Sequence, residues 1–359
     1  MIKIYSSLKS FIILPGIFVL VAAMPFSCNV AKEGGIFKSE NFGENWQQKV
    51  TVSKKETLAS HQILAMELDP FNPNIIYAGT ENGLYRSDSG ADSWELVQDE
   101  KKNPDARASI LDIKISPQNS NLIYAAVYQG RFGRVLRSTN SDSPWEQMYI
   151  VSKEGVSITA IEVDKKGQNI YIGTSEGGLL ESADFGLSWK IIGWFNAAIK
   201  GVKINSEDGR IIYVLALNKG IFKTSDQGVN WQLLADPVAQ NSGSAIGSFT
   251  GGNIRDFLID ARSQNSLYAG TDKGIFLSSD CGQTWRVFSS LISPESAPIS
   301  AIAQDIGNPT IFYYGAASIV YRTQNNGQTW TVHQLPSSKQ INLIKVDPID
   351  SNIIYVGVK

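Results

Sequence analysis

Short apolar runs recur along the chain and alternate with polar turns, and no helical period persists long enough to indicate a helical domain. The clearest unit is ILAMELDPFNPNIIYAGTENGLYRS, from Ile63 to Ser87. It predicts a strand, a turn rich in Pro and Asn, a second apolar strand, a glycine turn and a third strand. Counterparts of the apolar second strand begin at Ile75, Asn121, Asn169, Ile211, Ser266, Ile311 and Ile353. Seven such units indicate an all-β repeat fold.

A second motif, the box, follows the third strand: Ser or Thr, any residue, Asp or Asn, any residue, Gly, two further residues and Trp. SADFGLSW, from Ser182 to Trp189, is a complete copy. We expect the acid and the hydroxyl to bond to backbone N–H groups of a tight turn, and the glycine to supply a positive φ. The Trp is expected to bury a large apolar surface against the next layer. The residues given these structural roles are Asp184, Gly186, Trp189, Asp226, Gly228, Trp231, Asp280, Gly282, Trp285, Trp330 and Trp46.

Two of the seven boxes are degenerate, because they keep the hydroxyl and the Trp but lack the Gly in register. They are SDSGADSW, from Ser87 to Trp94, and STNSDSPW, from Ser138 to Trp145. Successive box tryptophans, at positions 46, 94, 145, 189, 231, 285 and 330, are 42 to 54 residues apart. This spacing suits a four-stranded propeller blade of roughly 40–50 residues.

The two ends of the repeat are complementary. The chain reaches Lys359 just after a second strand, and from Glu33 it starts with a third strand and a box. Joining these pieces would complete one blade and leave no unpaired sheet edge. We therefore predict one domain over residues 29–359, a seven-bladed β-propeller of four-stranded antiparallel blades in which the N- and C-terminal strands share a blade.

Composition excludes several function classes. A net charge of −2 gives no basic face for a nucleic-acid partner. The two cysteines, Cys28 and Cys281, form no disulfide framework, and His61 and His333 have no spacing typical of a metal site. The glycine-rich stretch from Ser242 to Asn253 lacks the Lys and the helix of a phosphate-binding loop. We therefore expect neither a metal nor another cofactor.

The first 28 residues predict an export signal. Lys3 and Lys9 give a basic start, and the apolar stretch from Phe11 to Met24 is short for a membrane span. Cys28 follows, so lipid attachment at this residue is an alternative that would make the protein a lipoprotein, although no Leu stands three positions before it. The expected location is extracytoplasmic: a periplasm, a lumen-like compartment or the cell surface.

The boxes and the DPFNPNIIYAGT phrase resemble those of the BNR, or Asp-box, propellers, and the resemblance covers nearly all of residues 33–359. That superfamily includes sialidases, xyloglucan-type endoglucanases, sortilin-type receptors and the photosystem II stability/assembly factors. In size and blade number the chain is most similar to the assembly factors. The resemblance implies binding at the ring face formed by the second-to-third-strand turns and the crossovers between blades, with redox or photosynthetic machinery as a setting.

Two sets of charged residues on that face are candidates for a site. A basic rim for an acidic peptide or another carboxylated ligand could be formed by Arg131, Arg134, Lys219, Arg255 and Lys273. Carboxylates stand in three of the glycine turns, at Glu81, Glu176 and Asp272. Paired carboxylates across a cleft can hydrolyse a glycoside, but acids in exposed glycine turns are also ordinary turn formers.

These observations favour an exported, non-enzymatic interaction or assembly subunit whose partners are other proteins. The alternative is a carbohydrate-active propeller, either a glycan binder or a divergent glycosidase. Sialidases carry an Arg-Ile-Pro phrase that is absent here, and xyloglucan-cleaving enzymes typically join two rings, whereas this sequence predicts one. No catalytic residue is therefore assigned.

Overall fold

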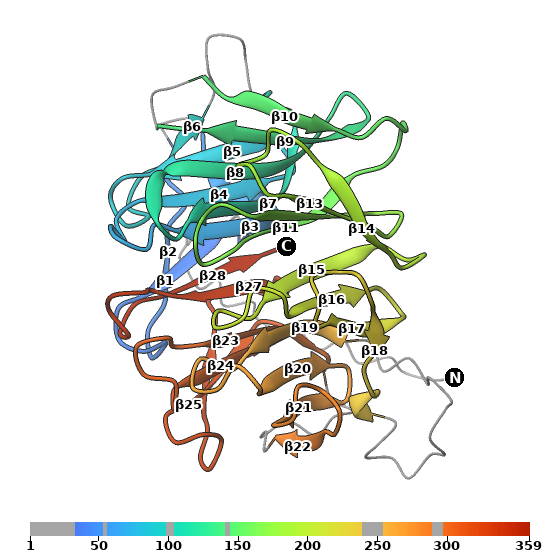
Figure 1. The fold of residues 1–359 in the computed structure, drawn as a ribbon. Helices are drawn as coiled ribbons and strands as arrows, with labels where there is room; N and C mark the ends of the chain where they lie inside the picture. Colours follow the sequence, from blue (N-terminus) through green and yellow to red (C-terminus); the bar gives the residue numbers. More distant parts are fainter. Residues whose placement is uncertain (1–32, 53–55, 98–103, 141–143, 239–253, 289–296) are drawn as a thin grey trace, which may run out of the picture. The chain divides into compact units, whose positions relative to one another are not determined.

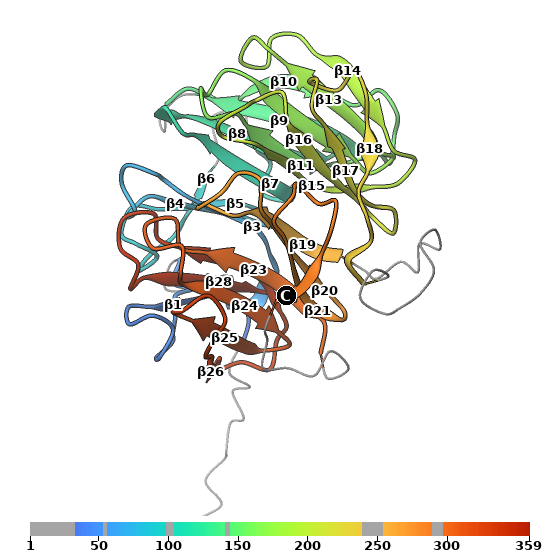
Figure 2. The same ribbon diagram turned by 60° about the horizontal axis from the view of Figure 1, so that its bottom comes forward.

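The computed structural model describes residues 33–52, 56–97, 104–140, 144–238, 254–288 and 297–359. These residues form seven four-stranded antiparallel sheets, each one blade of a propeller (Figure 1). The first strand of every blade contacts the first strands of both neighbouring blades, so these strands encircle a central channel. The fourth strands lie at the periphery, as β14 and β18 do in Figure 2. The prediction of a seven-bladed, all-β propeller is confirmed.

The strands follow one another in chain order from blade to blade. Blade 1 contains β3 (Ile63–Leu68), β4 (Ile76–Thr80), β5 (Gly83–Ser87) and β6 (Glu95–Val97). Blade 2 contains β7 (Ser109–Ser116), β8 (Asn119–Gln129), β9 (Phe132–Ser138) and β10 (Glu146–Ile150). Blade 3 contains β11 (Ile158–Val163), β12 (Ile170–Thr174), β13 (Gly178–Ser182) and β14 (Lys190–Trp194).

The remaining blades have the same plan. Blade 4 contains β15 (Ile199–Ile204), β16 (Ile212–Ala216), β17 (Gly220–Thr224) and β18 (Gln232–Leu233). Blade 5 contains β19 (Ile254–Ile259), β20 (Leu267–Thr271), β21 (Gly274–Ser278) and β22 (Arg286–Phe288). Blade 6 contains β23 (Ile299–Gln304), β24 (Phe312–Ala316), β25 (Ile319–Thr323) and β26 (Thr331–Gln334). Blade 7 joins β27 (Ile341–Val346) and β28 (Ile354–Val358) to β1 (Ile36–Ser39) and β2 (Gln47–Gln48). A short 3₁₀ helix, η1 (Leu58–Ser60), precedes blade 1.

Blade 7 closes the ring with strands from both ends of the sequence. β1 pairs antiparallel with β28, with Phe37 opposite Val356, and the sheet order is β2-β1-β28-β27. The Ser337 hydroxyl donates to the Glu33 carbonyl at 2.7 Å and adds a second link between the terminal segments. The predicted sharing of one blade is confirmed. The predicted export signal and Cys28 lie outside the described residues, as do parts of the crossovers between blades, at 98–103, 239–253 and 289–296.

The core is divided among the interfaces between blades. Seven clusters of buried side chains each join two neighbouring blades. Close approach is built into the second strands: a Cβ placed on Gly173 of β12 would lie 2.4 Å from the Ile199 side chain of the next blade. Glycine is therefore needed there for contact between the blades.

The boxes that lie wholly within the described residues form the expected turns between third and fourth strands. In the box from Ser182 to Trp189, the N–H of Gly186 donates to the Ser182 hydroxyl at 2.8 Å, and the N–H of Ser188 donates to Asp184 at 2.8 Å. Gly186 has a φ of 92°, which L-residues avoid. The degenerate box that ends at Trp94 forms the same turn, with Ser89 accepting the N–H of Ser93 and Ala91 at a φ of 77°.

Box tryptophans contact the outer strand of the preceding blade, or the residues just after that strand. The indole N–H of Trp231 donates to the carbonyl of Ile192 in β14, and that of Trp94 to the carbonyl of Lys49 just after β2. Burial varies: Trp94 is fully buried, whereas Trp189 remains partly exposed. The boxes therefore connect blades as well as closing hairpins.

Candidate functional site

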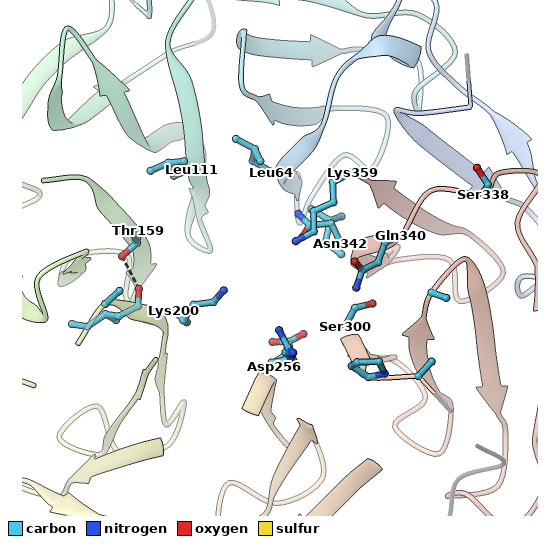
Figure 3. Close-up of a pocket in the computed structure, with 17 residues that line it drawn as sticks. Leu64, Leu111, Thr159, Lys200, Asp256, Ser300, Ser338, Gln340, Asn342 and Lys359 are labelled. Carbon is cyan, nitrogen blue, oxygen red and sulfur yellow. Dashed lines mark hydrogen bonds between the residues drawn. The ribbon is translucent and has the colours of Figure 1, made fainter. Parts of the chain in front are cut away.

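A cavity of about 840 Å³ opens at the mouth of the central channel, on the face of the crossovers and second-to-third-strand turns (Figure 3). One side chain from the same position of the first strand in each blade lines it. In blade order these are Leu64, Leu111, Thr159, Lys200, Arg255, Ser300 and Asn342. We call them the mouth residues. The end of the chain at Lys359 also lies near the centre of the ring (Figures 1 and 2).

A backbone irregularity places the mouth residues. In β3 the pairing runs from Ile63 opposite Thr80 to Ala65 opposite Gly79, so Leu64 has no partner. The same register shift occurs at the mouth residue of every other blade. A β-bulge of this kind bends the strand and re-aims the extra side chain. The residue before each bulge is a buried Ile, such as Ile63 or Ile199, which anchors the strand in the core.

The mouth residues divide the cavity by chemistry. Leu64 and Leu111 stand on the neighbouring blades 1 and 2, and Figure 3 shows them across the cavity from Lys200 and Asp256. The cations Lys200 and Arg255 stand on blades 4 and 5. The polar mouth residues are already engaged with the backbone: the Thr159 hydroxyl donates to the Ile199 carbonyl at 2.6 Å, and the Asn342 amide to the Ile63 carbonyl at 2.8 Å.

The cations at the mouth lack carboxylate partners. Within the part of the chain that the structure describes, Lys200, Arg255 and Lys359 form no ion pair. Loss of hydration in the channel lowers the pKa of Lys200, and the charges of Lys359 and Arg255 lower it further, against the opposing charge of Asp256. An anion entering the mouth would relieve this repulsion.

Deeper in the channel, by contrast, the charges are paired. Glu67 lies 2.7 Å from Lys345 and 3.9 Å from Lys114, and Glu162 lies 3.3 Å from Lys203. Burial opposes ionisation of Glu67, but the charges of Lys114 and Lys345 outweigh it and hold the pKa of this carboxyl below its ordinary value. Each of these three lysines therefore has a glutamate within 3.9 Å.

Asp256 is the one carboxylate side chain among the described residues that line the mouth cavity. Its two oxygens accept the N–H groups of Phe257 at 2.8 Å and of Ile302 at 3.0 Å, which ties β19 to β23. Burial raises the pKa of Asp256, although these hydrogen bonds oppose the shift. Asp112 holds β7 to β11 in the same way, through the N–H of Ile161 at 2.9 Å. Both carboxylates therefore serve the joints between blades.

The predicted basic residues do not gather at one place. Arg255 lines the mouth cavity, whereas Arg131 and Arg134, in and after the β8–β9 turn, pair with Glu154 and Gln147 respectively. Lys219 and Lys273 lie in the second-to-third-strand turns of blades 4 and 5, between β16 and β17 and between β20 and β21.

The predicted acids are also apart from the cavity. Glu81 accepts the N–H of Gln62 at 2.8 Å and lies 3.6 Å from the His61 ring nitrogen Nδ1. Glu176 pairs with Lys153, and Asp272 stands in the β20–β21 turn. Sequence reasoning missed Lys200, Lys359 and the two leucines. Aligning the first strands on their leading Ile would have placed the mouth residues in one column.

Among the residues with described positions, no three His, Cys, Asp or Glu side chains gather in a way that could hold a metal ion. The same residues contain no helix with the length and hydrophobicity to cross a bilayer.

Comparison with known proteins defines the family. A model described as the DUF6242 beta propeller domain matches residues 118–356, more than half of the chain. The chain belongs to the DUF6242 beta propeller family. The matched region runs from just before β8 to within β28. It therefore includes Lys200 and Arg255, whereas Leu64 and Leu111 precede it in the sequence. A comparison with curated proteins gave no match.

Two groups of solved structures share the fold of this DUF6242 member. The GH74 xyloglucanase from Xanthomonas campestris is 17% identical, with a TM-score of 0.68 over 87% of this chain and 52% of the enzyme. The chain thus spans about half the length of that enzyme. YCF48 from Cyanidioschyzon merolae is 12% identical, with a TM-score of 0.62 over 83% of this chain and 96% of YCF48. A YCF48 bound to D1 peptide is 16% identical, with a TM-score of 0.61 over 83% and 94%. At these identities the likeness shows the fold alone.

Proposed function

We propose that this protein is an exported, non-enzymatic propeller that binds a segment of a partner protein at the channel mouth and thereby acts as an interaction or assembly subunit. The observation that carries the proposal is the set of unpaired cations, Lys200, Arg255 and Lys359, around a cavity of about 840 Å³. A cavity of this size is in the range that accepts an extended ligand. The ring is preordered, so binding costs it little conformational entropy.

Two further observations support a partner protein and the assembly-factor branch of the Asp-box propellers. The box sequences resemble that superfamily's repeat, and one structural neighbour is a YCF48 bound to a D1 peptide. Export rests on Lys3, Lys9 and the apolar stretch from Phe11 to Met24, and the extracytoplasmic complex belongs to the same proposal, with redox or photosynthetic machinery as one setting.

A carbohydrate-active function is the second candidate, because GH74 enzymes are also structural neighbours. Hydrolysis of a glycoside ordinarily needs two carboxyl groups on either side of the scissile bond. Among the described residues that line the mouth cavity, Asp256 has the sole carboxylate side chain, and both of its oxygens accept backbone N–H groups. This geometry favours binding of a protein segment over catalysis.

The test is purification of the tagged full chain from its native source, followed by size-exclusion chromatography. We expect the wild type to elute with a companion protein in fixed ratio, and the Lys200→Glu/Arg255→Glu variant to elute alone. Lys219→Glu/Lys273→Glu is the matched control, since it reverses two charges outside the cavity and should keep the companion. Release of reducing sugar or sialic acid that is lost on substituting Glu176 or Asp272 would instead establish the carbohydrate-active candidate.

A further inference from the structure

The channel mouth also specifies the chemistry of the segment it would accept. We propose that this segment carries a carboxylate that is held among Lys200, Arg255 and Lys359, together with an apolar side chain that packs on Leu64 and Leu111. This inference rests on the proposed function and adds the ligand class to it. Its argument has three steps: charge, shape and orientation.

The first step is the contrast between two levels of the same channel. The deeper lysines, Lys114, Lys203 and Lys345, each approach a glutamate within 3.9 Å. At the mouth, Lys200 lies three residues before Lys203 on the same strand, and Arg255 is the equivalent residue of the next blade. Neither cation has a carboxylate partner of this kind among the described residues. Their mutual repulsion, which also lowers the pKa of Lys200, is relieved by an anion and increased by a cation.

The second step is the size of the cavity. About 840 Å³ is far more than one carboxylate or one inorganic ion occupies, and it is within the range of pockets that enclose drug-sized ligands. A short stretch of polypeptide fits these dimensions. Aromatic side chains are absent from the described lining residues, so no aromatic ring is available there to stack on a sugar.

The third step is the position of the apolar wall. Leu64 and Leu111 come from blades 1 and 2, and Leu343, beside the bulge of blade 7, extends the same wall. Lys200 on blade 4 stands across the cavity (Figure 3), and Arg255 occupies the same strand position on blade 5. A segment that satisfies both walls presents its carboxylate toward Lys200 and Arg255 and its apolar side chain toward Leu64 and Leu111, while Lys359 meets the carboxylate from blade 7.

The test uses a library of acetylated hexapeptide amides on beads, sorted with the fluorescently labelled full chain. We expect the retained peptides to be enriched in Asp or Glu together with a large apolar residue. In a soluble retained peptide, replacing the acid by its amide should weaken binding roughly tenfold, the effect of losing one charge-assisted hydrogen bond. A second library with free C-terminal carboxylates and no acidic side chains distinguishes a terminal from a side-chain carboxylate.

Matched variants locate the binding. Lys200→Glu/Arg255→Glu should lose the selected peptides and should instead bind versions of them in which Lys replaces the acid. Lys219→Glu/Lys273→Glu, which reverses two charges outside the cavity, should bind as the wild type does. Thermal melting of each variant confirms that the ring is intact. Leu64→Ser/Leu111→Ser should retain the preference for an acid and lose that for the apolar residue.

Two other outcomes separate this inference from the proposed function. Peptides that are retained at the mouth without acidic enrichment would overturn the carboxylate while leaving a peptide-binding role in place. An absence of retained peptides, with Lys200-dependent binding to an array of uronate- and sialate-bearing glycans, would overturn both.

Discussion

At the scale of single residues, the box aspartates show how a local hydrogen-bond set maintains a turn. The Ser188 hydroxyl and N–H, together with the Ser182 hydroxyl, lower the pKa of Asp184 to about 2. In the next box, the N–H of Asn230 and the hydroxyl of Thr224 do the same for Asp226, also to about 2. Both carboxyls are therefore ionised in the folded turn at pH values where they would already be protonated in the unfolded chain.

The first prediction concerns acid stability. Because these carboxyls have lower pKa values in the folded state, their contribution to stability is complete above about pH 4 and is lost as the pH falls toward about 2. Thermal melting between pH 2 and pH 5 should therefore show a steep fall in the wild type. Asp184→Asn/Asp226→Asn should show a shallower one, since asparagine does not titrate.

The chain contains its own control for that variant. The boxes with Asn41 and Asn325 form the same turn, with the amide oxygens accepting the N–H groups of Asn45 and Thr329 at 2.9 Å. The double variant is thus expected to fold. An unchanged slope of melting temperature against pH would assign the acid sensitivity to other carboxyls.

At the scale of elements, the box hairpin is a connector between blades. Trp94 is fully buried, packs in the cluster that joins blades 7 and 1, and donates its indole N–H to Lys49 at 3.0 Å. Trp189 is partly exposed, bonds to Gly186 within its own turn and lies 5.6 Å from the Tyr149 ring of blade 2. Equivalent sequence positions therefore differ in how much apolar surface they bury.

The second prediction follows from this difference in burial. Trp94→Ala should lower the free energy of unfolding by about 3–5 kcal/mol, because it leaves a large cavity and an unpartnered carbonyl. Trp189→Ala should cost less, about 1–2 kcal/mol, since part of the Trp189 side chain is already exposed. Equilibrium urea denaturation of both variants measures the two costs. Equal losses would show that burial of the ring does not set the contribution of a box.

At the scale of the whole molecule, the ring depends on the pairing of β1 with β28. That contact joins residues near opposite ends of the sequence, and the Ser337 hydroxyl reinforces it through the Glu33 carbonyl. Without β28, the edges of β27 and β1 would be exposed to other chains.

The third prediction tests this closure. Deleting Ile353 to Val358 should broaden the melting transition and produce aggregates in size-exclusion chromatography. Removing Lys359 alone is the control, since it leaves β28 intact and should yield a monomer that melts as the wild type does. A soluble monomer with unchanged melting after the longer deletion would contradict the role of the shared blade.

The repeat made the fold predictable from sequence, because seven copies of a strand phrase and a box define both the blades and their closure. The site was harder to predict from the sequence. Lys200 and Arg255 are charged, whereas Leu64 and Leu111 are apolar, so their side chains do not mark them as equivalent. What the four residues share is a bulge, and the bulge depends on pairing with the second strand. The apolar pattern does skip two positions at the bulge, from Ile199 to Val202 and from Ile254 to Phe257, but this spacing alone does not indicate that the intervening side chains line a cavity.

Each bulge separates a residue that stabilises the ring from a residue that a ligand would contact at the centre of the ring. At each bulge the preceding isoleucine is buried in the core, while the next side chain lines the cavity at its own position around the channel axis. Thr159 and Asn342 also bond to carbonyls of the next blade, whereas Leu64 and Leu111 have no side-chain hydrogen bond to lose, so substitution of these leucines leaves the neighbouring joints undisturbed. Related propellers could therefore change ligand specificity through a few substitutions at these positions, and protein engineering could use the same route.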